Sequence, residues 1–432
     1  MKKTVFTLLF LLFALSALHA DALGDYIAAP EQGFGYTELS RSELPQALRC
    51  ELSMNSVSYK GAQWKHRVTV IVPKTVTVPD TALVFAVMGG ALDEIDKYAG
   101  MIGSLMGCPL AIVWDVPNKQ PGLSDDGAIA ASIQAALSGQ KTEDIMLFPM
   151  AKSVIKALDV CDDYLPKAGA KASKYVIGGP SKDGWITWLA AASGDKRIAG
   201  IVPVIFDFLN MEKQLALQKE SYGRYSDMIK EYTAFEALLT SDKGKEVLKA
   251  IDPASYASKI KIPKLIINAS NDSYWNIASA NLYFDSLPGD KYLYYVMNMD
   301  HGKTLDGSPL DPLSLLPVFN TVAHFTEKCA GASRMPAPSW TWTTVNGALR
   351  CTVKAPAGAE ISSAAAFIAQ GTSKDLRKSK FTLAPMAKAG NTASVTIKPE
   401  GSFKAAVCRI SLVCDNKPYD VWTTPKVIEP EK

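Results

Sequence analysis

The sequence predicts an α/β protein with a mostly parallel sheet, followed by a smaller antiparallel β-sandwich. Three observations lead to this fold class. Apolar, strand-like runs alternate with helix-like segments from about residue 66 to residue 330, a polar helical segment at 211–258 interrupts them, and the composition changes near 333–339. Alternation of buried strands with helices is typical of a parallel sheet that is covered on both faces.

Residues 1–20 predict a signal peptide. Lys2 and Lys3 precede an apolar run, VFTLLFLLFALSA, and small residues follow around Ala20 and Ala22. This order of charge, apolar core and small residues is typical of secretory signals, and the run is short for a membrane span. We expect a secreted or periplasmic protein with no membrane span after signal removal, and an uncleaved anchor is the alternative.

The mature α/β unit is predicted over residues 21–332. Its first part, 21–65, has a mixed, loop-rich composition. Apolar runs then predict strands at 66–73, 81–90, 109–117, 174–177, 197–210, 261–270 and 291–298. Helices are expected at 91–107, 143–165 (interrupted near Pro149), 186–193 and 315–329.

Residues 211–258 are rich in Tyr and Lys and have a helical pattern between two strands. We interpret them as a helical cap inserted over the carboxyl edge of the sheet. A plain long crossover is the alternative, although connections of this length without a function are uncommon.

The last segment, 335–432, follows a linker punctuated by Pro336 and Pro338. Its Thr, Val and Ser content and closely spaced turns predict an antiparallel, Ig-like β-sandwich. A disulfide from Cys351 to Cys408 or Cys414 would bridge the two sheets, and buried free thiols are the open alternative.

The charge and the histidine count exclude several function classes. Removal of residues 1–20, which hold two lysines, lowers the formal net charge from +3 to +1. A chain this close to neutrality offers no basic footprint for nucleic acid. Seven cysteines without a C-x-x-C spacing and only four histidines do not indicate a metal site, and we expect no cofactor.

The segment KYVIGGPSKDGWITW, residues 174–188, carries the most information about chemistry. A short β-rich run meets two glycines, then Pro180 and Ser181, and a helical pattern follows. A strand, a sharp turn with one serine and a helix present a hydroxyl to substrate. Gly179 stands two residues before the serine, but Asp183 takes the position two residues after it, where glycine is usual. The alternative is that Ser181 only caps the helix.

An oxyanion hole would need two backbone N–H groups near this serine. The amide of Lys182 is one candidate. The second is Gly90 or Ala91, after the strand at 81–90, where glycine permits a close approach of backbone to substrate.

Asp272 and His301 complete a candidate triad because each follows an apolar, strand-like run. The chain order Ser181, Asp272, His301 is the order of an α/β-hydrolase. Asp207, one strand earlier, is the competing acid, and Asp272 has the alternative of a turn residue. His66 and His324 are the weaker candidate bases.

Asn118 and Gln120, in VPNKQPG, follow another strand and are candidate substrate contacts. Ordinary turn residues are the alternative. Together these residues predict a serine hydrolase acting on a small-molecule or peptide ester or amide.

The chain also resembles the PhoPQ-activated pathogenicity-related protein family of bacteria and some amoebae. The similarity runs through ELSMNSVSYKGAQWKHRVTVIVP, VPNKQP, GGPSKDGWITW, VPVIFDFLNM, IDPASYASKIKIPKLIINASNDSYW and LPGDKYLYYVMNMDHG. The family's serine turn reads G-A-S-K-R-G-W, so this chain departs from it at Pro180 and Asp183. Its N-D aspartate and N-x-x-H histidine correspond to Asp272 and His301.

The resemblance implies an α/β-hydrolase fold with a β-rich C-terminal domain, and serine hydrolase activity that is peptidase-like. The segment GTSKDLRKSKF echoes the family's R-D-F-R-like motif, with Leu376 in place of the aromatic residue. Family members are also associated with signalling or virulence. The resemblance therefore implies, as the alternative, a secreted binding protein with an inactive triad and a cell-surface receptor as its partner.

Overall fold

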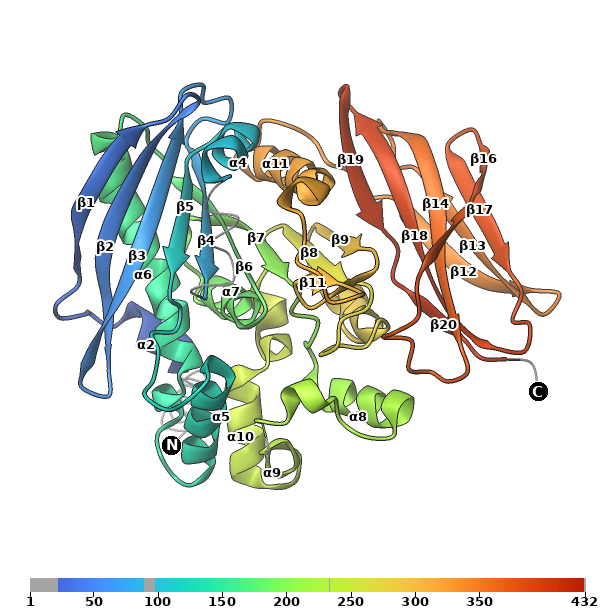
Figure 1. Ribbon diagram of the computed structural model, residues 1–432, viewed down its shortest axis with the longest axis horizontal. Coiled ribbons are helices and arrows are strands. Elements are labelled where there is room, and N and C mark those ends of the chain that lie inside the picture. The colour runs from blue at the N-terminus through green and yellow to red at the C-terminus, as the bar shows by residue number, and fades with distance from the viewer. Residues whose placement is uncertain (1–21, 89–97, 233, 431–432) are drawn as a thin grey trace, which may run out of the picture.

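The protein is described by a computed structural model that covers residues 22–88, 98–232 and 234–430. The predicted signal peptide, residues 1–20, lies outside the described residues. Figure 1 shows the chain running from the N-terminal strands at one end, through a central α/β part, to β-strands at the other end.

Among the described residues, nine strands form the central sheet in the order β1-β2-β3-β5-β4-β6-β7-β8-β9. The strands from β5 to β9 are parallel, whereas β1, β2 and β3 form antiparallel pairs at one edge. Their bounds are β1 (Gly35–Glu43), β2 (Ala47–Tyr59), β3 (Ala62–Pro73), β4 (Thr81–Val87), β5 (Leu110–Trp114), β6 (Lys174–Pro180), β7 (Ile198–Val204), β8 (Lys264–Ala269) and β9 (Lys291–Val296).

The strand order reverses at β4, because the chain goes from β4 to β5 on one side and then to β6 on the other. In open parallel sheets, ligands bind outside the carboxyl ends of the strands at such a switch point. The crevice beyond the ends of β4 and β6 is therefore where a site is expected, and Ser181 follows β6 directly.

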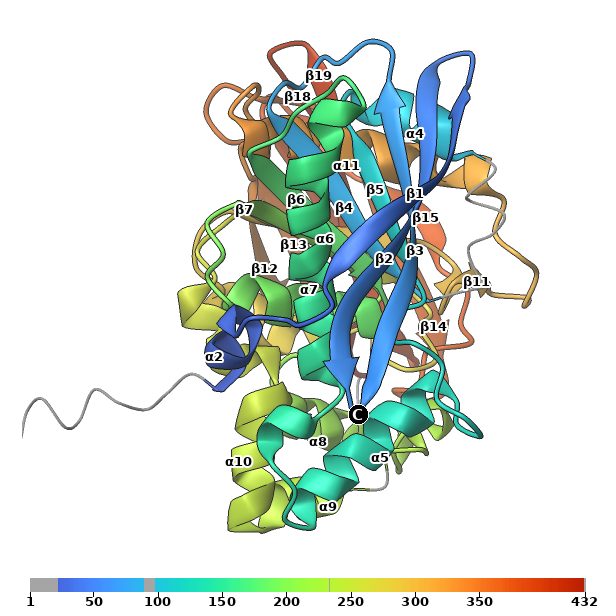
Figure 2. The same cartoon turned by 90° about the vertical axis from the view of Figure 1, so that its left-hand side faces the viewer.

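Helices cover both faces of this sheet. Helix α4 packs against α11 on one face, and α6 packs against α7 on the other, as Figure 2 shows. The helices of this part are α2 (Ala22–Ala28), α4 (Ala99–Met106), α5 (Asp125–Leu137), α6 (Leu147–Lys167), α7 (Lys182–Ala192) and α11 (Leu316–Ala330). Short 3-10 turns are η2 (Thr142–Asp144), η5 (Ser279–Leu282), η6 (Phe284–Ser286) and η7 (Pro312–Leu315).

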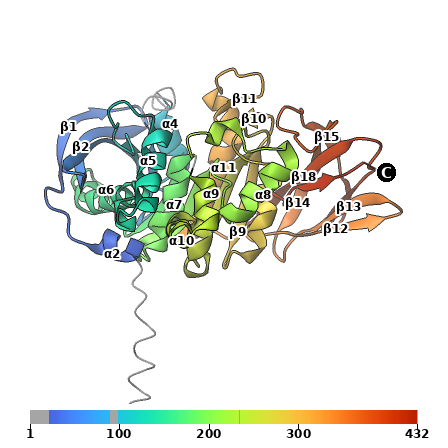
Figure 3. The same ribbon diagram turned by 90° about the horizontal axis from the view of Figure 1, so that it is seen from below.

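The segment between β7 and β8 is helical. It contains α8 (Met211–Tyr222), η3 (Asp227–Ile229), α9 (Phe235–Thr240), α10 (Asp242–Ile251) and η4 (Pro253–Lys259). With α5, helices α8 to α10 lie below the end of the sheet at which β4 and β5 finish (Figures 1 and 3). The expected helical insertion is thus present as helices, and its action as a lid stays a prediction.

The C-terminal part consists of two antiparallel sheets, β12-β13-β17-β16 and β15-β14-β18-β19, with β20 paired to β18. Their bounds are β12 (Ser339–Val345), β13 (Ala348–Lys354), β14 (Glu360–Gly371), β15 (Thr382–Pro385), β16 (Ala387–Ala389), β17 (Thr392–Ile397), β18 (Phe403–Cys414), β19 (Lys417–Trp422) and β20 (Lys426–Ile428). Cys351 lies in the sheet of β13 and Cys408 in the sheet of β18, and the neighbouring thiol of Cys351 together with burial raises the pKa of Cys408. All seven cysteines are free, so the free-thiol alternative describes this structure.

The two parts pack directly on each other. Strand β19 lies against β9 and α11. The ring of Trp422 meets the rings of Tyr294 and Tyr295 edge-on, at centroid distances of 6.0 and 6.3 Å. Two ion pairs, Arg334 with Asp415 and Lys417 with Glu327, cross the same boundary. The last strand of the parallel sheet is thereby covered by the C-terminal part.

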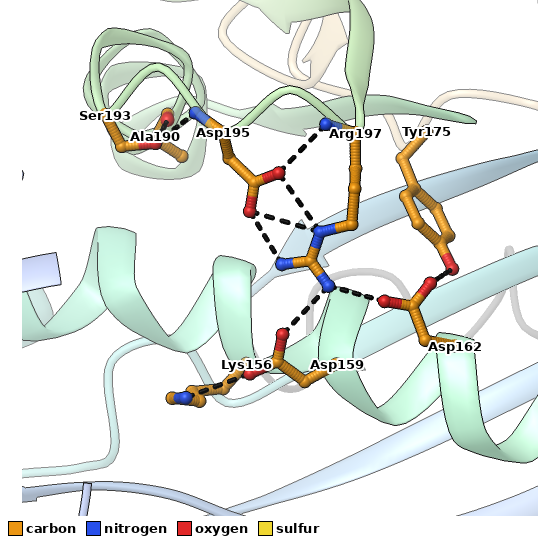
Figure 4. Close-up of polar contacts among 8 residues, drawn as sticks. All are labelled: Lys156, Asp159, Asp162, Tyr175, Ala190, Ser193, Asp195 and Arg197. Carbon is orange, nitrogen blue, oxygen red and sulfur yellow. Dashed lines mark hydrogen bonds and ion pairs between the residues drawn. The ribbon is translucent and has the colours of Figure 1, made fainter. Parts of the chain in front are cut away.

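A charged network at the amino ends of β6 and β7 ties strands to helix α6 (Figure 4). The guanidinium of Arg197 donates to both carboxylate oxygens of Asp195 and also reaches Asp159 at 2.9 Å and Asp162 at 2.6 Å. The hydroxyl of Tyr175 donates to the other oxygen of Asp162. Because it lies at the opposite ends of the strands from Ser181, this cluster has a structural role.

Three expectations for the elements were wrong. Residues 35–59 form two long strands, β1 and β2, although 21–65 was expected to be loop-rich. Helix α5 had no counterpart in the sequence prediction. Pro149 does not interrupt a helix, because α6 begins at Leu147 and proline is tolerated in a first turn.

Candidate active site

Ser181 occupies a strained turn between β6 and α7. Its φ and ψ are 55° and −123°, a combination that residues other than glycine rarely adopt, and its amide donates to the carbonyl of Val204 at the end of β7. Such strain costs about 1–3 kcal/mol and persists only where the surroundings enforce it. The turn therefore holds the serine side chain away from the helix that follows.

Gly179 and Gly184 allow the strand and the helix to cross closely at this turn. A Cβ atom at Gly179 would lie 2.7 Å from the carbonyl oxygen of Ala86 and from the Cβ of Asp183. One at Gly184 would lie 2.9 Å from the Cβ of Phe206. The turn thus forms with Asp183 in place, because the glycine one position later provides the space.

Ser181, His301 and Asp272 are hydrogen-bonded in one chain. The Oγ atom of Ser181 lies 2.8 Å from Nε2 of His301. The other ring nitrogen, Nδ1, lies 2.9 and 3.0 Å from the carboxylate oxygens of Asp272. A proton on Nδ1 suits the carboxylate and leaves Nε2 as the acceptor for the serine hydroxyl.

His301 stands in the turn between β10 (Met299–Asp300) and β11 (Lys303–Thr304). Its amide donates to the carboxylate of Asp300, which also accepts from the amide of Ser273 beside Asp272. The ring of Tyr274 lies 4.1 Å from the imidazole. The loops that carry the acid and the base are therefore tied to each other.

Neither of the alternative bases is placed like His301. His66 is buried, its Nε2 lies 2.8 Å from Ser56 and its Nδ1 lies 3.0 Å from the carbonyl of Trp114. Burial lowers the pKa of His66 to about 4, so that it stays neutral. The Nε2 atom of His324 lies 2.9 Å from the backbone carbonyl oxygen of Arg334, at hydrogen-bond distance.

Asp207, the competing acid, accepts a hydrogen bond from the hydroxyl of Tyr283 rather than from a histidine. It is 3% exposed, and burial raises its pKa to about 7. The negative charge of Asp272 adds to this rise in the pKa of Asp207. Sequence reasoning ranked Asp272 above Asp207, and it is the carboxylate of Asp272 that lies beside the ring of His301; its role as the orienting acid stays a prediction.

Lys182 is the first residue of α7, and the first amides of a helix lack an intrahelical acceptor. Gly90 and Ala91 lie outside the described residues. The role of Lys182 and Gly90 in an oxyanion hole stays a prediction.

The side chains of Asn118 and Gln120 are engaged by the backbone. Asn118 accepts from the amide of Lys65 at 2.7 Å and donates to its carbonyl at 3.0 Å. Gln120 donates to the carbonyl of Asn118. These contacts match the turn alternative, and a substrate contact for either residue stays a prediction.

Two cavities adjoin the hydrogen-bonded chain of Ser181, His301 and Asp272. One, of about 20 Å³, is lined by Ser181 and by aromatic side chains from four segments: Trp185, Phe206, Phe208, Tyr232, Tyr274 and Trp275. The other, of about 320 Å³, lies between the sheet and helices α4 and α11 and has an apolar lining that includes Pro180 and Gly302, the neighbours of Ser181 and His301.

Sequence reasoning did not connect the site to a segment of the C-terminal part. The side-chain amide of Asn271 donates to the carbonyls of Arg377 and Ser379. The guanidinium of Arg377 lies 3.6 Å from the centre of the Tyr222 ring and donates to the carbonyl of Ser273 at 3.1 Å. The echo of an R-D-F-R motif was the only signal for this contact, and it gave no partner.

The fold and this serine turn define the chain as an α/β-hydrolase in architecture: a mostly parallel sheet, helices on both faces and a strand-turn-helix serine at the switch point. In particular, the chain belongs to the PhoPQ-activated pathogenicity-related protein family, whose sequence model matches residues 23–377.

Several known proteins are similar to this chain over part of its length. The autocrine proliferation repressor protein A of Dictyostelium discoideum is 26% identical over 358 residues, which cover 78% of this chain and 70% of that protein. Acetyl xylan esterase 1 of a Thermoanaerobacterium species is 16% identical, with a TM-score of 0.49, over 71% of this chain and 91% of its own. The S-formylglutathione hydrolase of Agrobacterium tumefaciens is 13% identical, with a TM-score of 0.44, over 68% and 99%.

The described part of the chain contains no helix with the length and apolarity that crossing a membrane requires.

Proposed function

We propose that this protein is an exported serine hydrolase that cleaves an ester or amide bond through an acyl-enzyme. The observation that carries the proposal is the continuous chain from Ser181 through His301 to Asp272, with distances of 2.8 and 2.9 Å, at a strained turn between strand and helix. Nucleophile, base and orienting acid within hydrogen-bond distance are the arrangement that this chemistry requires.

The reaction would begin with attack of the Ser181 oxygen on the substrate carbonyl carbon while Nε2 of His301 takes the hydroxyl proton. The carboxylate of Asp272, which is only 4% exposed, would stabilise the resulting imidazolium. His301 then gives the proton to the leaving oxygen or nitrogen. A water molecule then attacks the carbonyl carbon of the acyl-enzyme while His301 takes its proton. His301 returns the proton to the Ser181 oxygen, and the carboxylic acid product is released.

The tetrahedral oxyanion needs donors where its charge develops. The amide of Lys182 is the donor that we assign from the described residues, and Gly90 is the proposed second donor. This chemistry requires neither a metal ion nor a cofactor. A small molecule or a peptide would be the substrate.

The first test is labelling of the purified mature protein by a fluorophosphonate probe, which reacts with activated serines. We expect stoichiometric labelling of the wild type and its loss in Ser181→Ala and His301→Ala. Ser56→Ala is a matched control, because Ser56 also lies 2.8 Å from a histidine nitrogen but is buried and has no carboxylate on the far side of the ring. Absence of labelling in folded wild-type protein would refute the hydrolase proposal.

A secreted signalling protein on an idle hydrolase scaffold is the second candidate. It is favoured by one observation, the similarity to a protein named for autocrine repression of proliferation. In that case Ser181→Ala would retain the biological effect in an assay of cell proliferation, and binding to a cell-surface receptor would carry the function instead.

A further inference from the structure

The apolar cavity of about 320 Å³ lies against the face of the central sheet that α4 and α11 cover. Its walls come from β4, β5, the end of β7, the two helices and the loop after His301. Among the described residues, its lining includes no charged, hydroxyl or amide side chain. The indole N–H of Trp114, on β5, is already used, because it donates to the hydroxyl of Thr69 at 2.9 Å. A ligand in this cavity would therefore meet apolar surface alone.

A void of this size is unusual inside a folded chain. Protein interiors are packed so closely that few spaces exceed one water molecule, and atoms that line an empty space lose their packing contacts. Ile205, Ala269 and Met299 form a small buried cluster apart from the main core, and Ile205 and Met299 line the cavity. Apolar cavities of about half this volume stay free of water and take up apolar guests. The cavity is therefore suited to an apolar ligand.

Ile205, in the wall of this cavity, has a strained backbone. Its φ is 45°, in the left-handed region that β-branched residues rarely adopt. Its amide donates to the carbonyl of Ile267 at 2.7 Å, and its own carbonyl accepts from the indole of Trp275 at 3.1 Å. Ile205 lines the apolar cavity, whereas the next residue, Phe206, lines the small cavity at Ser181. Strain of this kind persists where the surroundings enforce it, and it is concentrated at functional sites.

The apolar cavity also reaches the neighbours of the proposed nucleophile and base. Pro180, which immediately precedes Ser181, and Gly302, which immediately follows His301, both line it. Val204 lines it as well, and its carbonyl accepts a hydrogen bond of 2.8 Å from the amide of Ser181. A chain attached to a carbonyl carbon at the Ser181 oxygen would therefore need only a few bonds to reach apolar walls.

The volume of the apolar cavity sets the length of such a chain. A water molecule takes up about 30 Å³ of liquid, and a methylene group is of similar size. A cavity of about 320 Å³ therefore holds a chain of about eight to twelve carbons. An acetyl group would leave most of this space empty, and a chain of about sixteen carbons would exceed it.

We propose that the apolar cavity binds the hydrocarbon chain of the substrate's acyl group, so that the substrate is a fatty acyl ester or amide of medium chain length. This inference deepens the proposed hydrolase function and rests on it for the acyl-enzyme. The chain belongs to the acyl group because that group stays bonded to the Ser181 oxygen until water attacks. The leaving alcohol or amine must depart earlier, with the proton that His301 supplies.

The first test compares fluorophosphonate probes whose alkyl group on phosphorus takes the place of the acyl chain. Labelling rates of wild-type protein are measured with ethyl, decyl and hexadecyl probes and corrected for the reaction of each probe with water. We expect the decyl probe to label at least about tenfold faster than the ethyl probe, because its chain is buried, and faster than the hexadecyl probe, which is too long. Equal rates for the ethyl and decyl probes would overturn the inference and leave the hydrolase proposal intact.

Two series of esters then assign the chain to one side of the scissile bond. The acyl series compares p-nitrophenyl decanoate with p-nitrophenyl acetate, and the alcohol series compares decyl acetate with ethyl acetate. We expect kcat/KM to rise with chain length in the acyl series alone. A preference confined to the alcohol series would overturn the assignment to the acyl group.

Substitution locates the chain in the cavity. Val318→Trp places a larger side chain in the cavity from α11, and the ratio of the decyl to the ethyl labelling rate should fall about tenfold. Val345→Trp is the matched control, because it makes the same exchange at an exposed end of β12 and should keep the wild-type ratio. If Val318→Trp does not fold, Leu315→Trp, also in the lining, serves as the second variant. An unchanged ratio in the folded cavity variant would overturn the inference.

Calorimetry measures binding without any reaction. Wild-type protein is titrated with 1-octanol and with 1-butanol, and we expect 1-octanol to bind at least about tenfold more tightly, because four more methylene groups are buried. Val318→Trp should lose this difference. Equal binding of the two alcohols would overturn the inference whether or not the protein is labelled. Preferred binding of 1-octanol to a protein that never labels would refute the hydrolase proposal, overturn the assignment to an acyl group and leave an apolar ligand site alone.

Discussion

The side-chain amide of Asn271 donates a hydrogen bond of 2.8 Å to the backbone carbonyl of Ser379, 108 residues further along the chain. Asn271 immediately precedes Asp272, and its amide also reaches the carbonyl of Arg377 at 3.1 Å. The loop that carries the acid is thus held by a segment of the C-terminal part. The β-rich part therefore belongs to the support of the candidate site.

Asn271→Ala should lower kcat about tenfold or more, because the loop that carries Asp272 loses two hydrogen bonds on its neighbour. KM should change little, since Asn271 does not line the cavity at Ser181. The cost in stability should be about 1–3 kcal/mol. Steady-state kinetics and urea unfolding measure these effects separately.

Asn281→Ala is the matched control for this prediction. The amide of Asn281 also crosses to the C-terminal part, at the carbonyl of Pro425 (2.9 Å), but Asn281 stands in η5 and not beside Asp272. We expect a similar loss of stability with kcat retained. Equal loss of kcat in both variants would mean that Asn271 acts only through the packing of the two parts.

Gly179→Ala should prevent formation of the serine turn. The added methyl group would lie 2.7 Å from the carbonyl oxygen of Ala86, a contact that backbone must move to relieve. Overpacking of this kind costs about 1–3 kcal/mol or more. Thermal unfolding and fluorophosphonate labelling should both be impaired. Gly35→Ala is the control, because a Cβ there meets nothing within 4 Å; wild-type labelling in Gly179→Ala would contradict the argument.

The serine turn and the order of acid and base were predictable from local patterns. Two glycines, a serine and a helical run are contiguous, and each of Asp272 and His301 follows an apolar strand. The positions of those strands fix the side chains at one edge of the sheet. Whether the serine turn can form with an aspartate at position 183 could not be predicted in this way. The answer depends on how closely Ala86 and Phe206 approach the turn.

The missed strands illustrate a different limit. In β2, burial alternates at Cys50, Leu52 and Met54, with the polar residues Glu51 and Ser53 between them, so the period of two that predicts a strand was present in the sequence. Strand β1 is an edge strand and largely exposed, with no apolar pattern to recognise. Asn271 and Ser379 are 108 residues apart in the sequence, so local sequence patterns cannot predict their contact.

Arg197→Ala should lower the free energy of unfolding by about 2–3 kcal/mol, because Asp159, Asp162 and Asp195 would then repel one another without their shared cation. The side chain of Arg197 is 27% exposed, so solvent screening reduces the effect below that of a fully buried network. Arg224→Ala, which removes an exposed pair with Asp227, should cost less than about 0.5 kcal/mol. Urea unfolding gives both values, and equal values would rule out a special role for the network.

The buried carboxyl of Asp207 makes stability depend on pH. Burial raises the pKa of this group in the folded protein to about 7, from an ordinary value of 3.8, while the hydrogen bond from Tyr283 opposes the shift. Between about pH 4 and pH 7 the folded state therefore keeps a proton that the unfolded state has lost. By linkage, this group's contribution to the free energy of unfolding falls as pH rises through that window, by up to about 4 kcal/mol.

Asp207→Asn should abolish this dependence, because an amide keeps an acceptor for Tyr283 and does not ionise. The variant should gain stability relative to wild type between pH 5 and pH 7.5, by about 2–3 kcal/mol. The raised pKa of Asp183, also due to burial, acts in the same direction but is present in both proteins and cancels in the difference. Urea unfolding at the two pH values gives the result. Asp285→Asn, at an exposed carboxylate, supplies the baseline; curves for Asp207→Asn that run parallel to wild type would show that Asp207 is ionised in the folded protein throughout.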